Sequence, residues 1–218
     1  MITTLIFDLD GVIVDTAKYH YLAWKRLTEE LGLHFDLRDN ELLKGVSRRR
    51  SFEIILGLNG RRMDDEEIDR ICAVKNGYYL EYIHTLKKED ILPGVEDFLK
   101  KAHEKNYRIA LGSASKNSRL ILEKLGLTDR FDAIIDGTKV TNAKPDPEVF
   151  LKGCEELNTR PQESVVFEDS VAGIYAAHNG GMKAVGVSNS EVKPYCDYYI
   201  DGFTNADVDI LVKKTVGG

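Results

Sequence analysis

The chain has 218 residues, of which 43% are hydrophobic, and a formal net charge of −6 at pH 7. This length suffices for one core with a smaller cap, and the acidic balance gives no support for nucleic-acid binding. Cys72, Cys154 and Cys196 lie far apart without CxxC spacing, which indicates free thiols rather than a disulfide framework. No apolar run reaches membrane-spanning length and no secretion signal is visible, so we expect a cytoplasmic protein without membrane contact.

The first predicted strand covers residues 4–8 and leads into two carboxylates, Asp8 and Asp10. Side chains two residues apart on a strand point to the same face, where two like charges need a cation or a shared proton. One carboxylate can attack phosphorus while its neighbour acts as general acid and base. The pair predicts Asp8 as nucleophile and Asp10 as acid/base; the simpler alternative is that both only end a strand and cap a loop.

Residues 16–92 read as helices without a convincing strand. The simplest organisation is a core of residues 1–15 and 93–218, with residues 16–92 inserted after the first strand as a helical cap. In an open α/β sheet, ligands bind at the carboxyl ends of the strands. An insertion at this point would cover that edge.

Three cap residues are candidates for binding. Arg48, in the run Lys44-Gly45-Val46-Ser47-Arg48, suits bidentate contact with a phosphate, although a solvated basic patch is the simpler alternative. Lys75 shares a helical stripe with apolar residues and should point inward. His20 shares a helical face with Trp24, and a histidine of the cap's own core is the alternative.

From residue 93 onward, short apolar strands alternate with helical patterns. We expect strands at 108–112, 133–136, 164–168 and 183–187, a weaker one at 198–200, and helices at 95–104, 118–125, 147–157 and 171–179. Such alternation is typical of a parallel sheet with both faces covered. The predicted fold class is therefore α/β, a doubly wound parallel sheet with an inserted α-helical cap.

Residues that suit phosphate or metal chemistry follow three of these strands. The run 113–117, Ser-Ala-Ser-Lys-Asn, offers hydroxyls and N–H groups at a helix start, which can cradle a phosphate or simply cap the helix. Lys144 can neutralise a transferring phosphoryl group, unless it is only solvated. Glu168 and Asp169, beside Asp8, would supply the oxygen ligands that magnesium prefers, unless they only cap the next helix.

Four segments resemble, in order along the chain, the four motifs of the haloacid dehalogenase superfamily. They are Asp8-Leu9-Asp10-Gly11-Val12, Ser113-Ala114-Ser115, Lys144-Pro145 and Glu168-Asp169. In the cap, Lys44-Gly45-Val46-Ser47-Arg48 and Lys75-Asn76 are similar to the sugar phosphomutases of that superfamily. The resemblance implies a Rossmannoid core and Mg²⁺. It also implies interconversion of β-D-glucose 1-phosphate and glucose 6-phosphate, with β-glucose 1,6-bisphosphate as intermediate and activator.

The resemblance further implies roles for single residues. Asp8 would carry the phosphoryl group and Asp10 would be the acid/base. Mg²⁺ would lie among Asp8, Asp169 and the Asp10 carbonyl, with Glu168 nearby. Ser113, Ala114 and Lys144 would hold the transferring phosphate, and Arg48, Lys116 and Asn117 the other one. Thr16 and His20 would serve the cap hinge, while the sugar pocket would be lined by Lys44, Gly45, Val46, Ser51, Lys75, Asn76 and Ser115.

Other functions stay open at this point. A phosphatase acting on a small sugar phosphate would use Asp8 but let water take the phosphate, and it has less need for Arg48 and Lys75. A phosphonate-cleaving enzyme would need a cap lysine as a Schiff base, which Lys44 or Lys75 can supply. A non-catalytic sugar phosphate-binding protein is disfavoured by the intact acidic motifs and Lys144. The resemblance also implies a monomer whose only partners are small sugar phosphates.

Overall fold

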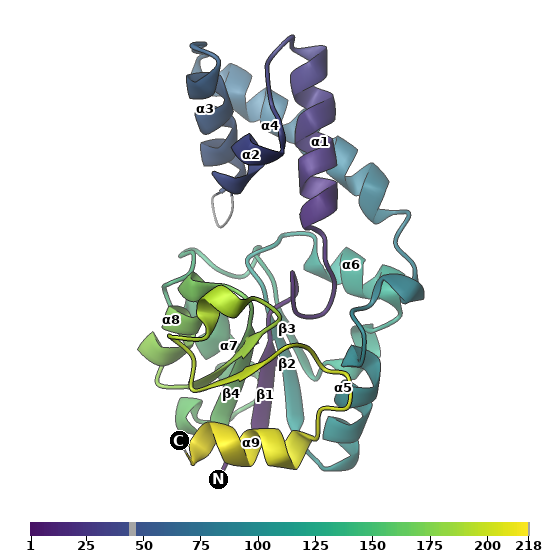
Figure 1. Ribbon diagram of the computed structural model, residues 1–218, viewed down its shortest axis with the longest axis vertical. Coiled ribbons are helices and arrows are strands. Elements are labelled where there is room, and N and C mark those ends of the chain that lie inside the picture. The colour runs from purple at the N-terminus through teal and green to yellow at the C-terminus, as the bar shows by residue number, and fades with distance from the viewer. Residues whose placement is uncertain (44–46, 218) are drawn as a thin grey trace. The chain divides into compact units, whose positions relative to one another are not determined.

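The computed structural model describes residues 1–43 and 47–217, and the chain forms two compact units (Figure 1). Met1–Asp15 and Lys87–Gly218 make one unit, here the core, and Thr16–Leu86 make the other, here the cap. The predicted cap extends to residue 92, whereas residues 87–92 belong to the core unit. The reason is local: the 3-10 helix η1 (Lys88–Asp90) packs against α6 (Ser118–Leu125), and the Leu92 N–H donates to the Ile13 carbonyl at 2.9 Å.

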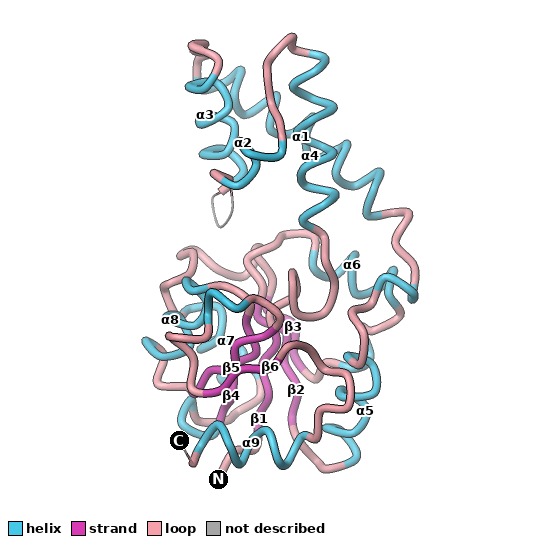
Figure 2. The backbone as a smooth tube through the Cα atoms, viewed as in Figure 1, coloured by secondary structure: helices cyan, strands magenta, loops and turns pink. Residues whose placement is uncertain are grey.

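The described part of the core holds six parallel strands in one sheet, ordered β3-β2-β1-β4-β5-β6 (Figure 2). The strands are β1 (Thr4–Phe7), β2 (Arg108–Gly112), β3 (Ala133–Ile135), β4 (Ser164–Glu168), β5 (Lys183–Val187) and β6 (Tyr198–Ile200). In the central strand, Phe7 pairs with Leu111 of β2 and with Phe167 of β4. All of β1 is buried, which explains the apolar run Leu5-Ile6-Phe7 that follows Thr4.

Helices cover both faces of this sheet. They are α5 (Val95–Glu104), α6 (Ser118–Leu125), α7 (Glu148–Glu156), α8 (Val171–Asn179) and α9 (Val208–Val216), with 3-10 turns η2 (Thr128–Arg130), η3 (Pro161–Glu163) and η4 (Ser190–Val192). On one face Phe7 stacks on Phe167 at 4.5 Å and meets Phe98 of α5. On the other face Ile6 packs in one cluster with Phe150 of α7. Neighbouring strand residues point to opposite faces, so the predicted doubly wound sheet is confirmed.

The described part of the cap is helical: α1 (Ala17–Glu30), α2 (Leu37–Glu41), α3 (Arg48–Leu58) and α4 (Asp65–Ile83). Its centre is a stack of Trp24 on Phe52, with ring centroids 5.9 Å apart. The predicted inward stripe of α4 is present, because Cys72 and Lys75 are both buried. None of the helices in the described residues is long and apolar enough to cross a membrane.

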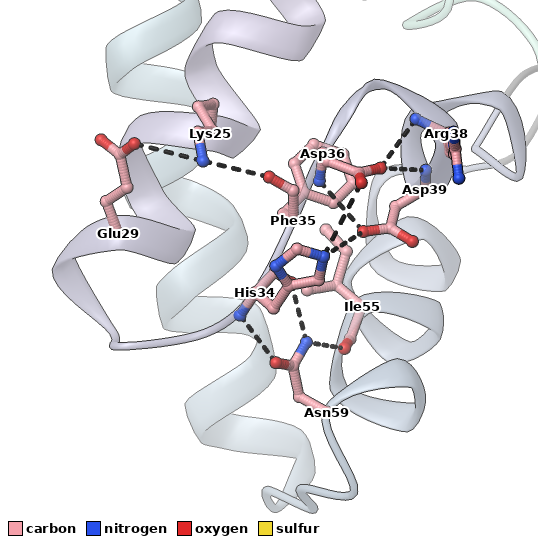
Figure 3. Close-up of polar contacts among 9 residues, drawn as sticks. All are labelled: Lys25, Glu29, His34, Phe35, Asp36, Arg38, Asp39, Ile55 and Asn59. Carbon is pink, nitrogen blue, oxygen red and sulfur yellow. Dashed lines mark hydrogen bonds and ion pairs between the residues drawn. The ribbon is translucent and has the colours of Figure 1, made fainter.

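The link between α1 and α2 is tied to the end of α3 (Figure 3). The His34 N–H donates to Asn59 Oδ1 at 2.7 Å, and Asn59 Nδ2 donates back to the His34 carbonyl at 2.9 Å. Asp36 caps α2: its carboxylate accepts from the Asp39 N–H, while the Asp39 carboxylate accepts from the Asp36 N–H. These contacts fix the chain on the side of the cap where α3 ends.

Candidate active site

The carboxyl ends of β1 and β4 bring the predicted acidic residues together. Asp8 follows β1 directly, and its N–H donates to the Phe167 carbonyl at 3.0 Å. Glu168 ends β4, and Asp169 follows it. Gly11, at φ +75°, leaves the space that the Asp169 carboxylate occupies, because a Cβ at this position would overlap it. The register of two adjacent strands therefore places Asp8 beside the Glu168-Asp169 pair.

The electrostatics of this group show an excess of negative charge. Burial raises the pKa of Asp8 well above its ordinary value, Lys144 opposes the rise, and Glu168, Asp10 and Asp169 add to it. Burial, together with Glu168 and Asp10, raises the pKa of Asp169 to about 7. Carboxylates that outnumber the cation beside them fit a divalent ion with oxygen ligands. The donor set of Asp8, Asp10 and Asp169 is therefore suited to Mg²⁺.

Lys144 is the cation of this site and comes from the loop between β3 and α7. Its Nζ lies 2.5 Å from Asp8 Oδ1, 2.5 Å from Glu168 Oε1 and 3.4 Å from the Gly112 carbonyl. Although burial opposes it, the charges of Asp8 and Glu168 raise the pKa of Lys144 above its ordinary value. Lys144 is therefore cationic at physiological pH and bridges the ends of β1 and β4.

The run 113–117 forms a turn between β2 and α6. Ser113 is buried, and its Oγ accepts from the Ser115 N–H at 3.1 Å. Ser115 Oγ accepts from the Asn117 N–H at 3.3 Å. A Cβ at Gly137 would overlap the Ala114 carbonyl, so this turn packs closely on the loop after β3. The hydroxyls of Ser113 and Ser115 hold the predicted phosphate cradle in shape. In doing so they accept hydrogen bonds from two of its N–H groups, those of Ser115 and Asn117.

Two residues absent from the predicted set contact the core site. Ser170 donates from N and from Oγ to Glu168 Oε2, both at 2.9 Å. Gly173 lies against the same carboxylate, and a Cβ there would overlap it. In the sequence these residues carry only the signal of a helix start, which is why reasoning from motifs does not find them.

In the cap, predicted residues from α1 and α4 meet. Lys75 is 1% exposed, and its Nζ lies 2.8 Å from His20 Nδ1. The same Nζ lies over the rings of Trp24 and Tyr79, 4.9 and 5.1 Å from their centroids. Thr16 is buried just before α1, and its carbonyl accepts from the His20 N–H at 3.2 Å. His20 is thus half-buried in the cap and a direct partner of Lys75.

The cap cluster carries positive charge. Arg48 begins α3, and its Nη2 donates to Asn76 Oδ1 at 2.7 Å, while Ser51 is buried one turn later. Burial and Arg48 lower the pKa of Lys75 to about 7, and burial, Lys75 and Arg48 lower that of His20 well below its ordinary value. Across residues 1–43 and 47–217, no carboxylate forms an ion pair with Lys75 or Arg48. Such a cluster suits an anionic ligand.

The remaining predicted cap residues, Lys44, Gly45 and Val46, lie outside the described residues. A second group of possible metal ligands, His34, Asp36 and Asp39, lies in the cap with one donor atom of each within 4.8 Å of the others (Figure 3). Asp36 and Asp39 are engaged in capping α2. Their place in the fold is therefore explained without a ligand.

Known proteins resemble this chain over most of its length. The haloacid dehalogenase-like hydrolase family matches residues 5–187. The β-phosphoglucomutase of Bacillus subtilis (strain 168) is 39% identical over 209 residues, which cover 95% of this chain and 92% of that protein. A phosphorylated carbohydrates phosphatase of Thermotoga maritima is 32% identical over 184 residues, 83% of this chain and 82% of that protein. The crystal structure of a β-phosphoglucomutase from Clostridium difficile has a TM-score of 0.91 at 40% identity, covering 100% of this chain and 98% of that chain.

Proposed function

Since the chain belongs to the haloacid dehalogenase-like hydrolase family, we propose that it is a phosphomutase interconverting β-D-glucose 1-phosphate and glucose 6-phosphate. The observation that carries the proposal is the cationic cluster of half-buried Arg48 and buried Lys75, for which the described residues supply no carboxylate partner. A sugar bisphosphate has two phosphates. An enzyme that binds it in both orientations needs cationic groups for the transferring phosphate and for the other phosphate. The relatives named β-phosphoglucomutase support the same choice.

The core residues perform the transfer. An oxygen of Asp8 bonds to phosphorus as the bond to the sugar oxygen breaks, and the Asp10 carboxyl gives its proton to that leaving oxygen. In the return step Asp10 takes the proton of the other sugar hydroxyl, whose oxygen attacks the aspartyl-phosphate. When that hydroxyl belongs to a glucose monophosphate, its attack on the aspartyl-phosphate gives β-glucose 1,6-bisphosphate and frees Asp8. Asp8 then takes the other phosphate of this intermediate, and the same bisphosphate serves as activator because it can supply the phosphoryl group that first loads Asp8. Lys144 contacts Asp8 Oδ1 and lies where it can balance the charge of the transferring group.

Mg²⁺ is part of this proposal. Asp8, Asp169 and the Asp10 backbone carbonyl would hold it, and when bound it neutralises charge on the transferring phosphoryl group. Glu168 stays near rather than among these ligands, because Lys144 and Ser170 already contact its two oxygens. Ser113 and Ala114 would bind the transferring phosphate from the β2 side.

The other phosphate and the sugar belong to the cap cations and the end of the 113–117 turn. Arg48, oriented by Asn76, would bind the second phosphate with Lys116 and Asn117. Lys75, Ser51 and Ser115 would contact the sugar, and Thr16 and His20 would serve the hinge. The roles of Lys44, Gly45 and Val46 in the sugar pocket rest on the sequence alone. We further propose a cytoplasmic monomer.

A phosphatase on a small sugar phosphate is the second candidate, favoured by the 32% identity to the Thermotoga maritima phosphatase. One incubation separates the two. Purified protein receives Mg²⁺, β-glucose 1-phosphate and a trace of glucose 1,6-bisphosphate, and glucose 6-phosphate and free phosphate are both measured. Glucose 6-phosphate with little free phosphate is the expected result. Free phosphate without glucose 6-phosphate would assign the phosphatase and overturn the mutase.

A further inference from the structure

The side chain of Glu168 is only 1% exposed, and each of its two carboxylate oxygens forms an ion pair or hydrogen bonds inside the protein. Oε1 lies 2.5 Å from Lys144 Nζ, and Oε2 accepts from the N–H and the hydroxyl of Ser170, both at 2.9 Å. A buried carboxylate stays ionised only when charge and hydrogen bonds compensate it. The partners on α8 therefore fix the orientation in which Glu168 meets Lys144.

We propose that Ser170, the N-cap of α8, and Gly173, in its first turn, are positioning residues for phosphoryl transfer that act through Glu168 on Lys144. The inference rests on the proposed function, in which Lys144 balances the charge of the transferring group. Neither residue needs to touch the substrate. Their effect travels along one line of contacts, from α8 to Glu168, from Glu168 to Lys144, and from Lys144 to Asp8.

The Ser170 hydroxyl has two fixed partners. Its oxygen accepts from the Gly173 N–H at 3.1 Å, which caps α8. A hydroxyl has one proton to donate, and in Ser170 this proton goes to Glu168 Oε2. The start of α8 thus fixes the position of the Ser170 hydroxyl, and this hydroxyl fixes the orientation of the Glu168 carboxylate.

Gly173 contributes space. It lies inside α8 with ordinary helical geometry, where glycine is less favourable than alanine, so its backbone freedom is not the reason for its presence. A Cβ would overlap the Glu168 carboxylate. By contrast, a Cβ on Gly153, the helical glycine of α7, would meet Ala110 at 3.6 Å, an ordinary contact. Space is needed in α8 because Glu168 fills it.

Lys144 is held between two carboxylates from adjacent strands, Asp8 after β1 and Glu168 at the end of β4. If Glu168 turned away, the ammonium group would lose one of these two anchors and would be drawn towards Asp8, the nucleophile. Displacement of a charge-balancing group by about 1 Å can cost about 100-fold in rate. The expected loss is therefore in kcat rather than in sugar binding.

The test compares Ser170→Ala, Ser170→Thr and Gly173→Ala with two matched controls. Asp207→Ala removes the cap of α9, where the carboxylate accepts from the Ile210 N–H at 2.9 Å, and Gly153→Ala adds a methyl to α7. For each Mg²⁺-loaded variant we would measure kcat, KM and the urea midpoint. A ¹⁹F NMR spectrum of the protein with beryllium fluoride, a mimic of a phosphorylated aspartate, reports the charge around Asp8 without turnover.

We expect Ser170→Ala and Gly173→Ala to lower kcat about 10- to 100-fold with KM within about 2-fold, and to shift the ¹⁹F resonances. Ser170→Thr should restore kcat, and both controls should leave kcat unchanged. In a Glu168→Gln background, Ser170→Ala should have no further effect on kcat. An unchanged kcat and ¹⁹F spectrum in Ser170→Ala, or a full effect in that background, would overturn the proposal. Phosphate release is followed as well, so a wild type that proves to be a phosphatase refutes the proposed function while kcat still tests the positioning.

Discussion

Replacing Lys75 with methionine is expected to stabilise the cap at neutral pH. Lys75 is 1% exposed, and its Nζ contacts His20 Nδ1 at 2.8 Å and lies near the rings of Trp24 and Tyr79. Burial and then the charge of Arg48 lower its pKa from 10.5 to about 7. Methionine fills a similar volume without a charge, so the variant keeps most of the packing and removes a buried ammonium group.

The magnitude follows from the link between protonation and unfolding. The unfolded chain keeps the Lys75 proton up to about pH 10.5, while the folded chain releases it near pH 7. Between these values the unfolded state binds more protons, so the free energy of unfolding rises with pH, by at most about 1.4 kcal/mol per unit. Below pH 7 the buried, protonated Lys75 therefore lowers the free energy of unfolding of the wild type by about 4–5 kcal/mol. The Lys75→Met variant avoids this cost but loses about 1–2 kcal/mol from the hydrogen bond and the ring contacts. The net gain of Lys75→Met should be about 2–4 kcal/mol below pH 7.

The assay is urea unfolding of the wild type and Lys75→Met between pH 6 and 10, followed by fluorescence. Trp24 is the chain's single tryptophan and stacks on Phe52, so its emission reports on the cap. Lys25→Met is the control, because Lys25 is partly exposed and pairs with Glu29 at 3.3 Å. The advantage of Lys75→Met should shrink as pH rises towards 10. If the variant is less stable than the wild type at pH 6 by the same amount as at pH 10, the reasoning is refuted.

The remaining predictions concern the core and turnover. Lys144→Ala should lower kcat/KM about 100- to 1,000-fold in the coupled assay, since it removes the charge beside Asp8; a loss below about 5-fold would contradict that role. Asp8→Asn should abolish turnover while calorimetry still detects binding of the bisphosphate, and residual turnover at the wild-type rate would exclude Asp8 as the nucleophile. Chelation of Mg²⁺ should stop turnover and lower the Tm, because the carboxylates around Asp8 then repel one another; an unchanged Tm would argue against a site there. Phe98→Ala should cost about 3–5 kcal/mol of stability in a urea titration, because Phe98 is buried against Phe7, and a cost below about 1 kcal/mol would contradict the packing.

The strands β1 to β5 could be predicted because they are almost wholly buried, which leaves a largely apolar run in the sequence, whereas β6 is only half-buried and gives a weaker signal. The helix α9 was not predicted. Its buried positions include Thr215 beside Val208 and Leu211, and a polar residue in the stripe weakens the pattern. In the cap, the sequence indicated helices without resolving α2 and α3, since α2 is short and has no buried residue.

The candidate site divides in a similar way. Residues at the ends of strands, such as Asp8 directly after β1 and Glu168 as the last residue of β4, could be found because parallel strands end at the same edge. The contacts of Lys144 with Asp8 and of Lys75 with His20 join residues 136 and 55 positions apart, and only the packed helices and strands determine them. The role of Gly173 could not be predicted from the sequence, because it depends on the Glu168 side chain that packs against this glycine.

The most direct test of the mutase concerns the cap cations. Glucose 6-phosphate and free phosphate would be measured in one tube for the wild type and Arg48→Ala, with Arg38→Ala as a control at an arginine of α2 outside the cationic cluster. We expect the wild type and the control to form glucose 6-phosphate with little free phosphate, and Arg48→Ala to lose most of the glucose 6-phosphate. Equal yields of glucose 6-phosphate from Arg48→Ala and the wild type, or free phosphate as the main product of the wild type, would contradict the account.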